Sequence, residues 1–432
     1  KRCMMNRLDI KKKLLMALTV FSMFFGAGNL IFPPFLALES GGNFLSALIG
    51  FFITAIGFPV LGLLAVGHSS GLRGLGDKVH PVFGFIFSLV LYLSIGPLLA
   101  IPRTAGTSYE MVAVSFGVNN IFVRILYSVV FFVLSGIIAL EPQKFTSRLG
   151  KILCPILLVM ITILFLGSLT LPSDGTLTTS EKYILSPFST GMIDGYQTMD
   201  AIAAIVFGVI ITINIKNLGI SDQNTILKEE RIAGLLSIIP FLVVYSFLAV
   251  AGRKAAYISP DATNGAQLLS VLSGTLFGKI GNVLISLIFI VACFNTSTSL
   301  LSSVSEFFAS SFPKVKRSIW IMIFAFSAMV FSNFGLNMIL KISVPILNLL
   351  YPVTISLIIL EIIPYTRNRK IFFKAVAFFS LLSSLVETIS PSTMGMITYK
   401  GSAGFLWVQP TLLSAIVVLV ITIIKEKRIG SK

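Results

Sequence analysis

Charged side chains are scarce in this sequence of 432 residues. Asp, Glu, Lys and Arg together make up 12% of it, where soluble proteins average about a quarter. Histidine occurs only twice, and the three cysteines, Cys3, Cys154 and Cys293, do not have the spacing of metal ligands. These shortages exclude a zinc site and a disulfide framework. They leave an apolar chain, in which 55% of the residues are hydrophobic.

Patterns that mark enzyme chemistry are also missing. The sequence has no Walker A, His-Glu-x-x-His or Gly-x-Ser-x-Gly motif, and the glycines at Gly71, Gly74 and Gly76 follow an apolar run rather than a strand. The net charge of +16 is spread over short loops and both ends of the chain, so nucleic acid is not an expected partner. We therefore expect neither enzymatic activity nor an organic cofactor.

Apolar runs recur along the whole sequence, and their length of roughly 20 residues crosses a hydrocarbon core about 30 Å thick. The mean hydropathy is +0.95. These runs predict an all-α membrane protein in a lipid bilayer. About twelve transmembrane helices are expected, in the ranges 14–38, 44–67, 81–102, 121–140, 149–171, 195–215, 232–251, 280–308, 318–332, 336–362, 372–388 and 404–424.

Lysine and arginine indicate the side of the membrane on which each loop lies. If the N-terminus is inside, most of the 33 basic residues fall in inner loops and at the two ends of the chain. This bias predicts that both termini are cytoplasmic. The two longest connections, near 172–194 and 252–278, then lie outside, and we expect them to form lids or short surface helices.

The number of spans predicts an internal repeat. A block of five spans begins and ends on opposite faces of the membrane, so a second block of five has the inverse orientation. We expect a first repeat at 14–171, an inverted second repeat at 195–362 and two appended helices at 372–424. The remaining ends, 1–13 and 425–432, are expected to be cytoplasmic tails. No clear residue-level repeat accompanies this division.

The first apolar segment is interrupted by the run Phe-Gly-Ala-Gly-Asn-Leu-Ile-Phe-Pro-Pro at 25–34. Glycine weakens a helix and proline removes a donor, so main-chain groups are released where lipid cannot satisfy them. Many secondary transporters hold substrate and ion at such a break. A half-helix that begins near Gly26, Ala27 and Gly28 would direct its positive end at a carboxylate. Close packing through small residues is the alternative.

Polar side chains are concentrated in the eighth apolar segment, between Asn295 and Glu306. Asn295, Ser299, Ser302 and Glu306 share one helical face, and a neutral cage of hydroxyl and carbonyl oxygens suits a small monovalent cation. The alternative is that the hydroxyls bond back to carbonyls one turn earlier. The segment therefore predicts either an ion site or a polar cavity wall.

Segments six and three each contribute one charged residue. Asp200 lies near the start of segment six, and an acid at the centre of a span costs about 2.5–3.5 kcal/mol and indicates function. Asp200 could lie near the membrane interface, and it could act as a gate, form a structural pair or bind an ion. Gly208 is the expected break opposite segment one, with helix packing as the alternative. Arg103 is a candidate outer gate paired with Glu110 or Asp200, or else a snorkelling side chain.

These stretches resemble the bacterial branched-chain amino acid:cation symporter family. The resemblance is carried by residues 24–34, by 96–110 with its Gly-Pro-Leu-Leu-Ala-Ile-Pro-Arg-Thr run, by 195–208 and by 294–297. It implies the fold of the amino acid–polyamine–organocation superfamily, with the inverted five-helix repeat of the leucine-transporter type. It also implies a place in the bacterial inner membrane.

The resemblance further implies which residues form the site. Main-chain groups in the broken parts of segments one and six would bind the substrate's carboxylate and ammonium groups. The implied substrate residues are Gly26, Ala27, Gly28, Asn29, Ala201, Ala204, Phe207 and Gly208. The superfamily's sodium pattern falls on Ser22, Phe25, Cys293, Thr296 and Ser297. Cysteine at 293 replaces the commoner alanine, which is tolerable because a main-chain carbonyl is the implied ligand.

The expected function is import of leucine, isoleucine or valine coupled to sodium by alternating access, without an obligate protein partner. A proton replaces sodium in the rival interpretation, in which Asp200 or Glu306 titrates. A non-transporting receptor is another rival, and a channel is disfavoured because no filter repeat is present. The sequence does not rank the three amino acids, since one methylene changes selectivity by only about 1–3 kcal/mol.

Overall fold

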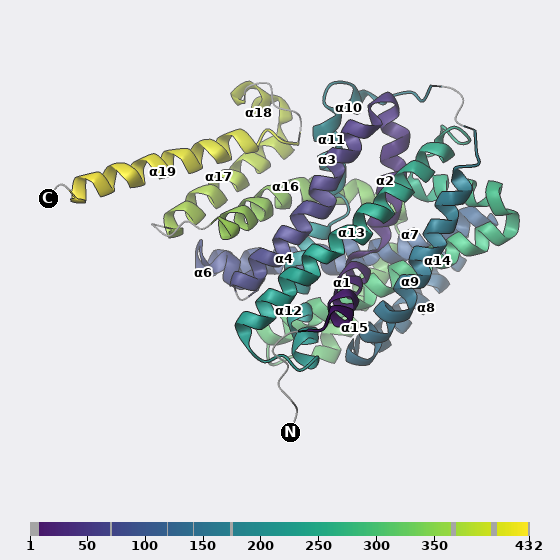
Figure 1. The fold of residues 1–432 in the computed structure, drawn as a ribbon, viewed down its shortest axis with the longest axis horizontal. Helices are drawn as coiled ribbons and strands as arrows, with labels where there is room; N and C mark the ends of the chain where they lie inside the picture. Colours follow the sequence, from purple (N-terminus) through teal and green to yellow (C-terminus); the bar gives the residue numbers. More distant parts are fainter. Residues whose placement is uncertain are drawn as a thin grey trace.

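The computed structural model describes residues 8–69, 71–118, 120–140, 142–172, 176–363, 369–398 and 404–430. Within these ranges the chain forms helices joined by turns and short loops, without a strand (Figure 1). The predicted all-α class is confirmed. Residues 1–7 of the expected N-terminal tail, including Cys3, and residues 431–432 of the C-terminal tail lie outside the described part.

The first apolar segment forms two helices, α1 (Ile10–Phe24) and α2 (Ala27–Ser40). Between them, Phe25 (φ −71°, ψ 99°) and Gly26 (φ −140°, ψ −151°) are extended. The Phe25 amide still donates to the Phe21 carbonyl at 2.9 Å and so ends α1. The predicted interruption of this segment is confirmed.

The remainder of the first half runs from the turn after α2 to residue 168. Two of its spans contain a short π-helical stretch, and the second stretch includes a non-helical residue, Gly96 (ψ −122°). The elements are α3 (Phe44–Phe52), η2 (Ile53–Gly57), α4 (Phe58–Ser69), α5 (Leu72–Asp77), α6 (Pro81–Leu93), η3 (Ser94–Leu98), α7 (Ala100–Phe116), α8 (Ile121–Leu140) and α9 (Pro142–Ser168).

The second half begins with two short helices in the connection predicted near 172–194. Its long helix α14 is kinked at Gly278 (φ 58°). The kink separates the first part of α14, residues 265–277, which belongs to the predicted 252–278 connection, from the eighth span. The elements are α10 (Glu181–Ile184), α11 (Pro187–Tyr196), α12 (Asp200–Asn217), α13 (Gln223–Ala256), α14 (Gly265–Ser311), α15 (Arg317–Ser332), α16 (Leu336–Ile362), α17 (Arg369–Ile389), α18 (Pro391–Ile397) and α19 (Val408–Gly430).

Side-chain caps explain several of these helix starts. The Asp222 carboxylate accepts from the Thr225 amide at 2.8 Å at the start of α13. The Asn264 side chain accepts from the Gln267 amide at 3.0 Å at the start of α14. Such caps satisfy amides that a helix leaves without partners in its first turn.

Every predicted apolar segment coincides with a helix or a helix pair. In the described residues, seven helical stretches are long and apolar enough to cross a membrane, and α12, bent by 45°, makes an eighth if counted as one span. Three further apolar helices are shorter, at Cys154–Ser168, Arg317–Ser332 and Val408–Thr422. The total of twelve spans therefore stays a prediction.

The helices pack in a pattern that suits an inverted repeat. α7 lies along α14, α13 packs on both α1 and α2, and α12 packs on α4. In an inverted repeat, segment one (α1 and α2) corresponds to segment six (α12), and segment two (with α4) corresponds to segment seven (α13). The contact of α12 with α4 then corresponds to the contact of α13 with α1 and α2. The repeat boundaries at 14–171 and 195–362 remain a prediction. At one edge, α17 packs on α16 and α19 on α17, and α19 runs outward to the C-terminus (Figure 1).

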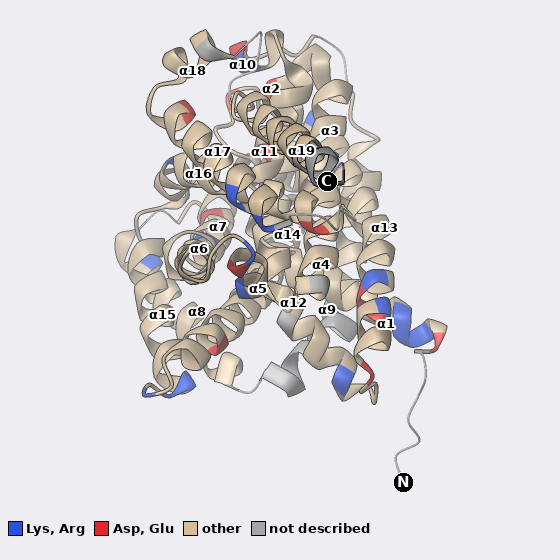
Figure 2. Ribbon diagram, turned by 90° about the vertical axis from the view of Figure 1, so that its left-hand side faces the viewer, with Lys and Arg blue, Asp and Glu red and all other residues tan. Residues whose placement is uncertain are grey.

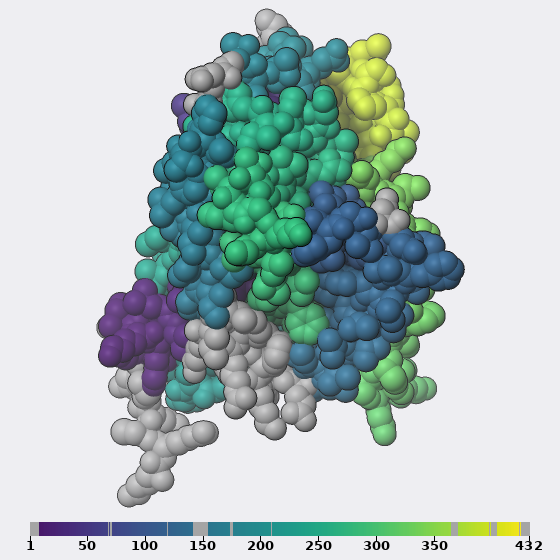
Figure 3. Space-filling model, turned by 90° about the vertical axis from the view of Figure 1, so that its right-hand side faces the viewer, coloured from purple at the N-terminus to yellow at the C-terminus, as the bar shows by residue number. Residues whose placement is uncertain are grey.

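Apolar side chains cover the outside of the bundle. Phe122 on α8, Phe326 on α15 and Leu413 on α19 are 77%, 64% and 62% exposed. Figure 2 shows few charged residues along the flanks, and Lys and Arg lie mostly in the lower half, which includes the N-terminus. The face in Figure 3 is closed by α14 together with helices of the first half. An exterior of this kind suits hydrocarbon better than water.

Candidate functional site

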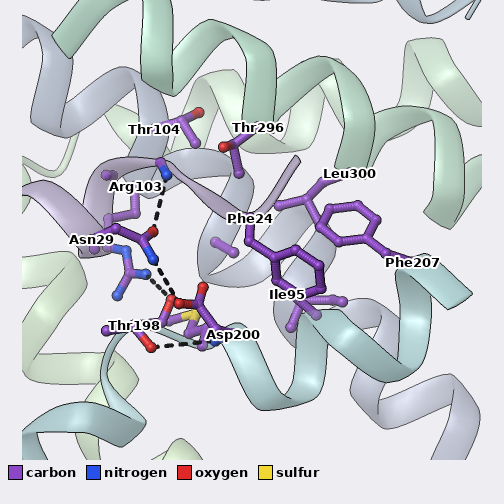
Figure 4. A pocket seen from close by; sticks show the side chains of 16 residues that line it. Phe24, Asn29, Ile95, Arg103, Thr104, Thr198, Asp200, Phe207, Thr296 and Leu300 are labelled. Carbon is purple, nitrogen blue, oxygen red and sulfur yellow. Dashed lines mark hydrogen bonds between the residues drawn. The ribbon is translucent and has the colours of Figure 1, made fainter. Parts of the chain in front are cut away.

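A small cavity lies between the break of segment one, α7, α12 and α14 (Figure 4). The predicted site residues on its walls are Gly26, Ala27, Gly28, Asn29, Arg103, Asp200, Phe207 and Thr296. The other lining residues are Phe24, Ile95, Ala100, Thr104, Thr198, Met199, Ala203 and Leu300. Residues from four distant parts of the sequence, expected to act together, therefore share one cavity.

The first turn of α2 presents unpaired main-chain donors to this cavity. The amides of Ala27, Gly28 and Asn29 have no acceptor within the described part of the chain, as expected for the first residues of a helix. The Asn29 side chain accepts from the Gly26 amide at 2.9 Å and so fixes the turn. Free amides at the positive end of a helix can hold an anion.

Two glycines allow this turn to lie close to its neighbours. A Cβ atom on Gly26 would lie 2.5 Å from Thr296 Oγ1 on α14. A Cβ atom on Gly28 would lie 2.7 Å from Arg103 Nη2 and 3.0 Å from the Thr198 Cα atom. Any side chain at either position would push the first break away from α14 or from the second break.

Segment six loses its helical geometry at residues 197–199, between α11 and α12. Met199 there has φ 67°, the only positive φ of a non-glycine residue among those described. At Gly208, the expected break, α12 bends by 45° between Asp200–Gly208 and Ile210–Asn217. Sequence reasoning missed the break at 197–199 because it contains neither glycine nor proline.

Arg103 is buried at this second break rather than at an outer helix end, with only 3% of its surface exposed. Its guanidinium donates to the carbonyls of Gln197 at 2.6 Å and Thr198 at 3.2 Å. It also lies 5.6 Å from the ring centre of Phe32. The side chain thus neutralises carbonyls that the end of α11 leaves without helical donors. Burial contradicts the snorkelling alternative.

Asp200 begins α12 and is 2% exposed, so it is buried within the helix bundle. Its Oδ2 atom accepts from Asn29 Nδ2 at 2.6 Å and from Tyr245 Oη at 2.8 Å. Asn29 also contacts the Tyr245 hydroxyl directly. Tyr245, on α13, was missed because a tyrosine inside an apolar run carries no positional signal. The general need of a buried tyrosine hydroxyl for a partner is the only hint.

The predicted substrate residues of α12 divide between two faces of the helix. Of these residues, Phe207 lines the cavity, on the same face as Asp200 and Ala203. The other three, Ala201, Ala204 and Gly208, face α4, which contains Gly62 and Val66. A Cβ atom on Gly62 would lie 3.2 Å from Ala204 Cβ and 3.4 Å from the Ala201 carbonyl oxygen. A Cβ atom on Gly208 would lie 2.7 Å from Val66 Cγ1. Helical periodicity explains the division, because positions three and four apart share a face.

The predicted sodium ligands lie where the end of α1 meets α14. The Ser22 carbonyl accepts from Asn295 Nδ2, and the Phe25 carbonyl accepts from Thr296 Oγ1 at 3.2 Å. Ser297 Oγ is buried and has no hydrogen-bond partner among the described residues. Cys293 is fully buried on the same helix. Carbonyl oxygens at the end of α1 thus meet side chains of α14, as at the ion sites of transporters with broken helices.

Glu306, the second acid considered for proton coupling, lies elsewhere. Its side chain is 59% exposed and pairs with Arg317 at 3.0 Å. Arg317 also donates to Ser302 Oγ at 2.9 Å. Glu306 does not line the cavity, so Asp200 is the carboxylate that does.

Solved structures with a similar fold include several transporters. One is a Na⁺-coupled sialic acid symporter in a substrate-bound outward-open state, with a TM-score of 0.62 and 15% identity, and the match covers 94% of this chain and 88% of that one. A second is MhsT in complex with L-phenylalanine (TM-score 0.58, 17% identity, 94% and 97%). A third is inward-facing Mhp1 (TM-score 0.57, 13% identity, 95% and 91%). These likenesses confirm the predicted leucine-transporter-type fold.

Sequence relatives cover nearly the whole chain. The branched-chain amino acid permease BraB of Bacillus subtilis is 35% identical over 433 residues, which is 97% of each chain. A putative branched-chain amino acid carrier protein of Staphylococcus aureus (strain USA300) is 36% identical over 359 residues, 80% of each. The family described as "Branched-chain amino acid transport protein" matches residues 9–426. The chain is therefore a multi-pass membrane transporter that belongs to the family of branched-chain amino acid transport proteins.

Proposed function

We propose that this chain imports leucine, isoleucine and valine together with sodium by alternating access. The observation that carries the proposal is the meeting of two helix breaks, at 25–26 and 197–199, at one cavity. In transporters with broken helices, such breaks supply main-chain groups that bind a substrate and an ion within the membrane.

The first break suits the carboxylate of an amino acid. The free amides of Ala27, Gly28 and Asn29 are directed at the cavity from the positive end of α2. Such an end stabilises an anion by roughly 0.3–2 kcal/mol, towards the upper limit when partly buried. The ammonium group then lies toward the second break, where α12 begins.

The opposite walls of the cavity suit a branched aliphatic side chain. Phe24 and Phe207 pack edge to face with ring centres 5.2 Å apart, and Ile95 and Leu300 also line the cavity. Apolar contact of this type gains about 25 cal/mol per Å² of buried surface but does not strongly distinguish leucine from isoleucine or valine. The cavity therefore favours the class more than any single member.

Sodium is proposed at the carbonyls of Ser22, Phe25 and Cys293 and the hydroxyls of Thr296 and Ser297. The Na⁺-coupled sialic acid symporter, which shares the fold, supports a sodium-dependent mechanism. Entry of one positive charge gains about 2.3 kcal/mol per 100 mV, enough for roughly fifty-fold accumulation. Ion coupling is therefore sufficient to concentrate a scarce amino acid.

Uptake of radiolabelled leucine into proteoliposomes tests this function. We expect accumulation under an inward sodium gradient, none when potassium replaces sodium, and competition by unlabelled isoleucine and valine. No leucine uptake under the sodium gradient would refute the proposal.

Proton coupling is a second candidate, favoured by one observation: Asp200, a buried carboxylate, lines the cavity. Uptake that persists without sodium and follows a pH gradient would support it. Ligand binding without accumulation would instead indicate a receptor. The same proteoliposomes distinguish these outcomes.

A further inference from the structure

The main-chain carbonyls expected to bind an ammonium group are already engaged or turned away. At the second break, the carbonyls of Gln197 and Thr198 accept from Arg103. α12 is helical from its first residue, and its Ala201 and Ala204 face α4 rather than the cavity. The second break therefore needs another acceptor for a cationic group.

Asp200 has an oxygen atom available for this purpose. Asn29 and Tyr245 both donate to Oδ2, so neither of them occupies Oδ1, while the Thr198 side chain also lies beside the carboxylate. Figure 4 shows Asp200 between Asn29 and the apolar side chains of Phe24 and Ile95. Its carboxylate therefore lies where polar and apolar walls of the cavity meet.

The Asn29 side chain places the proposed partners of the carboxylate and ammonium groups next to each other. The carboxylate and ammonium groups of such a molecule are attached to the same carbon atom, so their partners must be neighbours. Asn29 belongs to the first turn of α2, whose amides are free, and its side chain donates to Asp200. The anion site and the Asp200 carboxylate are thus joined through one residue.

We propose that Asp200 binds the ammonium group of the substrate directly, in place of the main-chain carbonyls of α12. This assignment rests on the proposed transport function. A buried carboxylate is tolerated when it is hydrogen-bonded and its charge is balanced. Asn29 and Tyr245 supply the hydrogen bonds, and Arg103 brings a positive charge to the same cavity. A zwitterion adds no net charge to this arrangement, whereas an amine or an acid alone does.

A cycle of protein and ligand changes tests the assignment. Binding to purified protein in saturating sodium is measured by titration calorimetry for leucine, for 4-methylpentanoate, which lacks the ammonium group, and for 3-methylbutan-1-amine, which lacks the carboxylate. In the wild type, loss of the ammonium group should weaken binding by about 10- to 100-fold, the usual size of a hydrogen bond to a charged group. In Asp200→Asn, that difference should fall to near one, with 4-methylpentanoate binding retained and amine binding lost.

Tyr245→Phe is the second variant, because it removes one donor and leaves the carboxylate in place. It should weaken leucine binding by about 2- to 10-fold and leave 4-methylpentanoate binding unchanged. The assignment is overturned if either variant weakens leucine and 4-methylpentanoate equally, which indicates a structural role, or if neither changes leucine binding. A shifted sodium requirement with an unchanged ligand difference would make Asp200 an ion ligand instead. Failure of the wild type to bind leucine at all refutes the transport function itself.

Discussion

Replacement of Gly28 by alanine tests the close approach of the two helix breaks. The added methyl carbon would lie 2.7 Å from Arg103 Nη2, 3.0 Å from Thr198 Cα and 3.2 Å from the Thr198 carbonyl oxygen. The arginine can shift, but the Thr198 contacts are main-chain atoms at the break itself. Overpacking of this kind costs about 1–3 kcal/mol.

If that whole cost falls on the substrate-bound state, leucine affinity drops by about 5- to 140-fold. Alanine is also a better helix former than glycine by about 1 kcal/mol, so α2 itself should not be destabilised. We therefore expect Gly28→Ala to lose sodium-driven leucine uptake and binding while its unfolding temperature in detergent stays close to that of the wild type.

Gly57→Ala is the matched control, since a Cβ atom there meets no other atom within 4 Å. Gly57 lies in the π-helical stretch between α3 and α4. Substitutions that meet no neighbouring atom usually change free energies by less than about 0.5 kcal/mol in either direction, so the variant should transport leucine within about twofold of the wild type. Wild-type uptake by Gly28→Ala would show that the breaks do not need this close approach.

Three further substitutions have defined outcomes. Ser297→Ala removes a buried hydroxyl that has no hydrogen-bond partner among the described residues, so the thermal stability in sodium-free buffer should be unchanged or higher. The sodium concentration for half-maximal uptake should rise. A loss of stability without that rise would contradict the ion site. Arg103→Lys replaces a two-pronged donor by a single ammonium group and should lower leucine uptake about tenfold or more, and wild-type uptake would contradict the role of Arg103 at the break. In α10, burial lowers the pKa of Lys182, but the Asp194 and Glu39 carboxylates outweigh it and raise the pKa above its ordinary value of 10.5. A raised lysine pKa stabilises the folded state below the ordinary pKa, and this stability is lost as the pH rises through the raised value, so Lys182→Gln should unfold at a lower temperature at pH 7 and match the wild type only at strongly alkaline pH.

Local chemistry made the first break predictable. Gly26 and Gly28 flank Ala27 in an apolar run, and a membrane helix interrupted by such residues must release main-chain groups. The same reasoning located the polar face of α14 near Asn295 and Thr296, whose side chains reach the carbonyls at the end of α1. In both places the signal is contained in a few neighbouring residues.

The second break could not be found in this way, because its cause is tertiary. Residues 197–199 include no helix breaker, and Met199 takes its left-handed conformation where Arg103, from another helix, binds the adjacent carbonyls. Glycine indicated only the break at Gly208, where α12 bends by 45°.

Asn29 illustrates why the chemistry of the site depends on contacts that no local pattern contains. From the sequence it is one more polar residue in an interrupted helix. In the structure its side chain accepts from the Gly26 amide and donates to Asp200, and it contacts Tyr245. Because these partners belong to three separate segments, a main-chain site predicted from the breaks becomes a site with a carboxylate at its centre. Charge in this cavity is therefore set by the packing of α2, α12 and α13 against one another, which is why the proposed zwitterionic substrate could not be matched to its partners from the sequence alone.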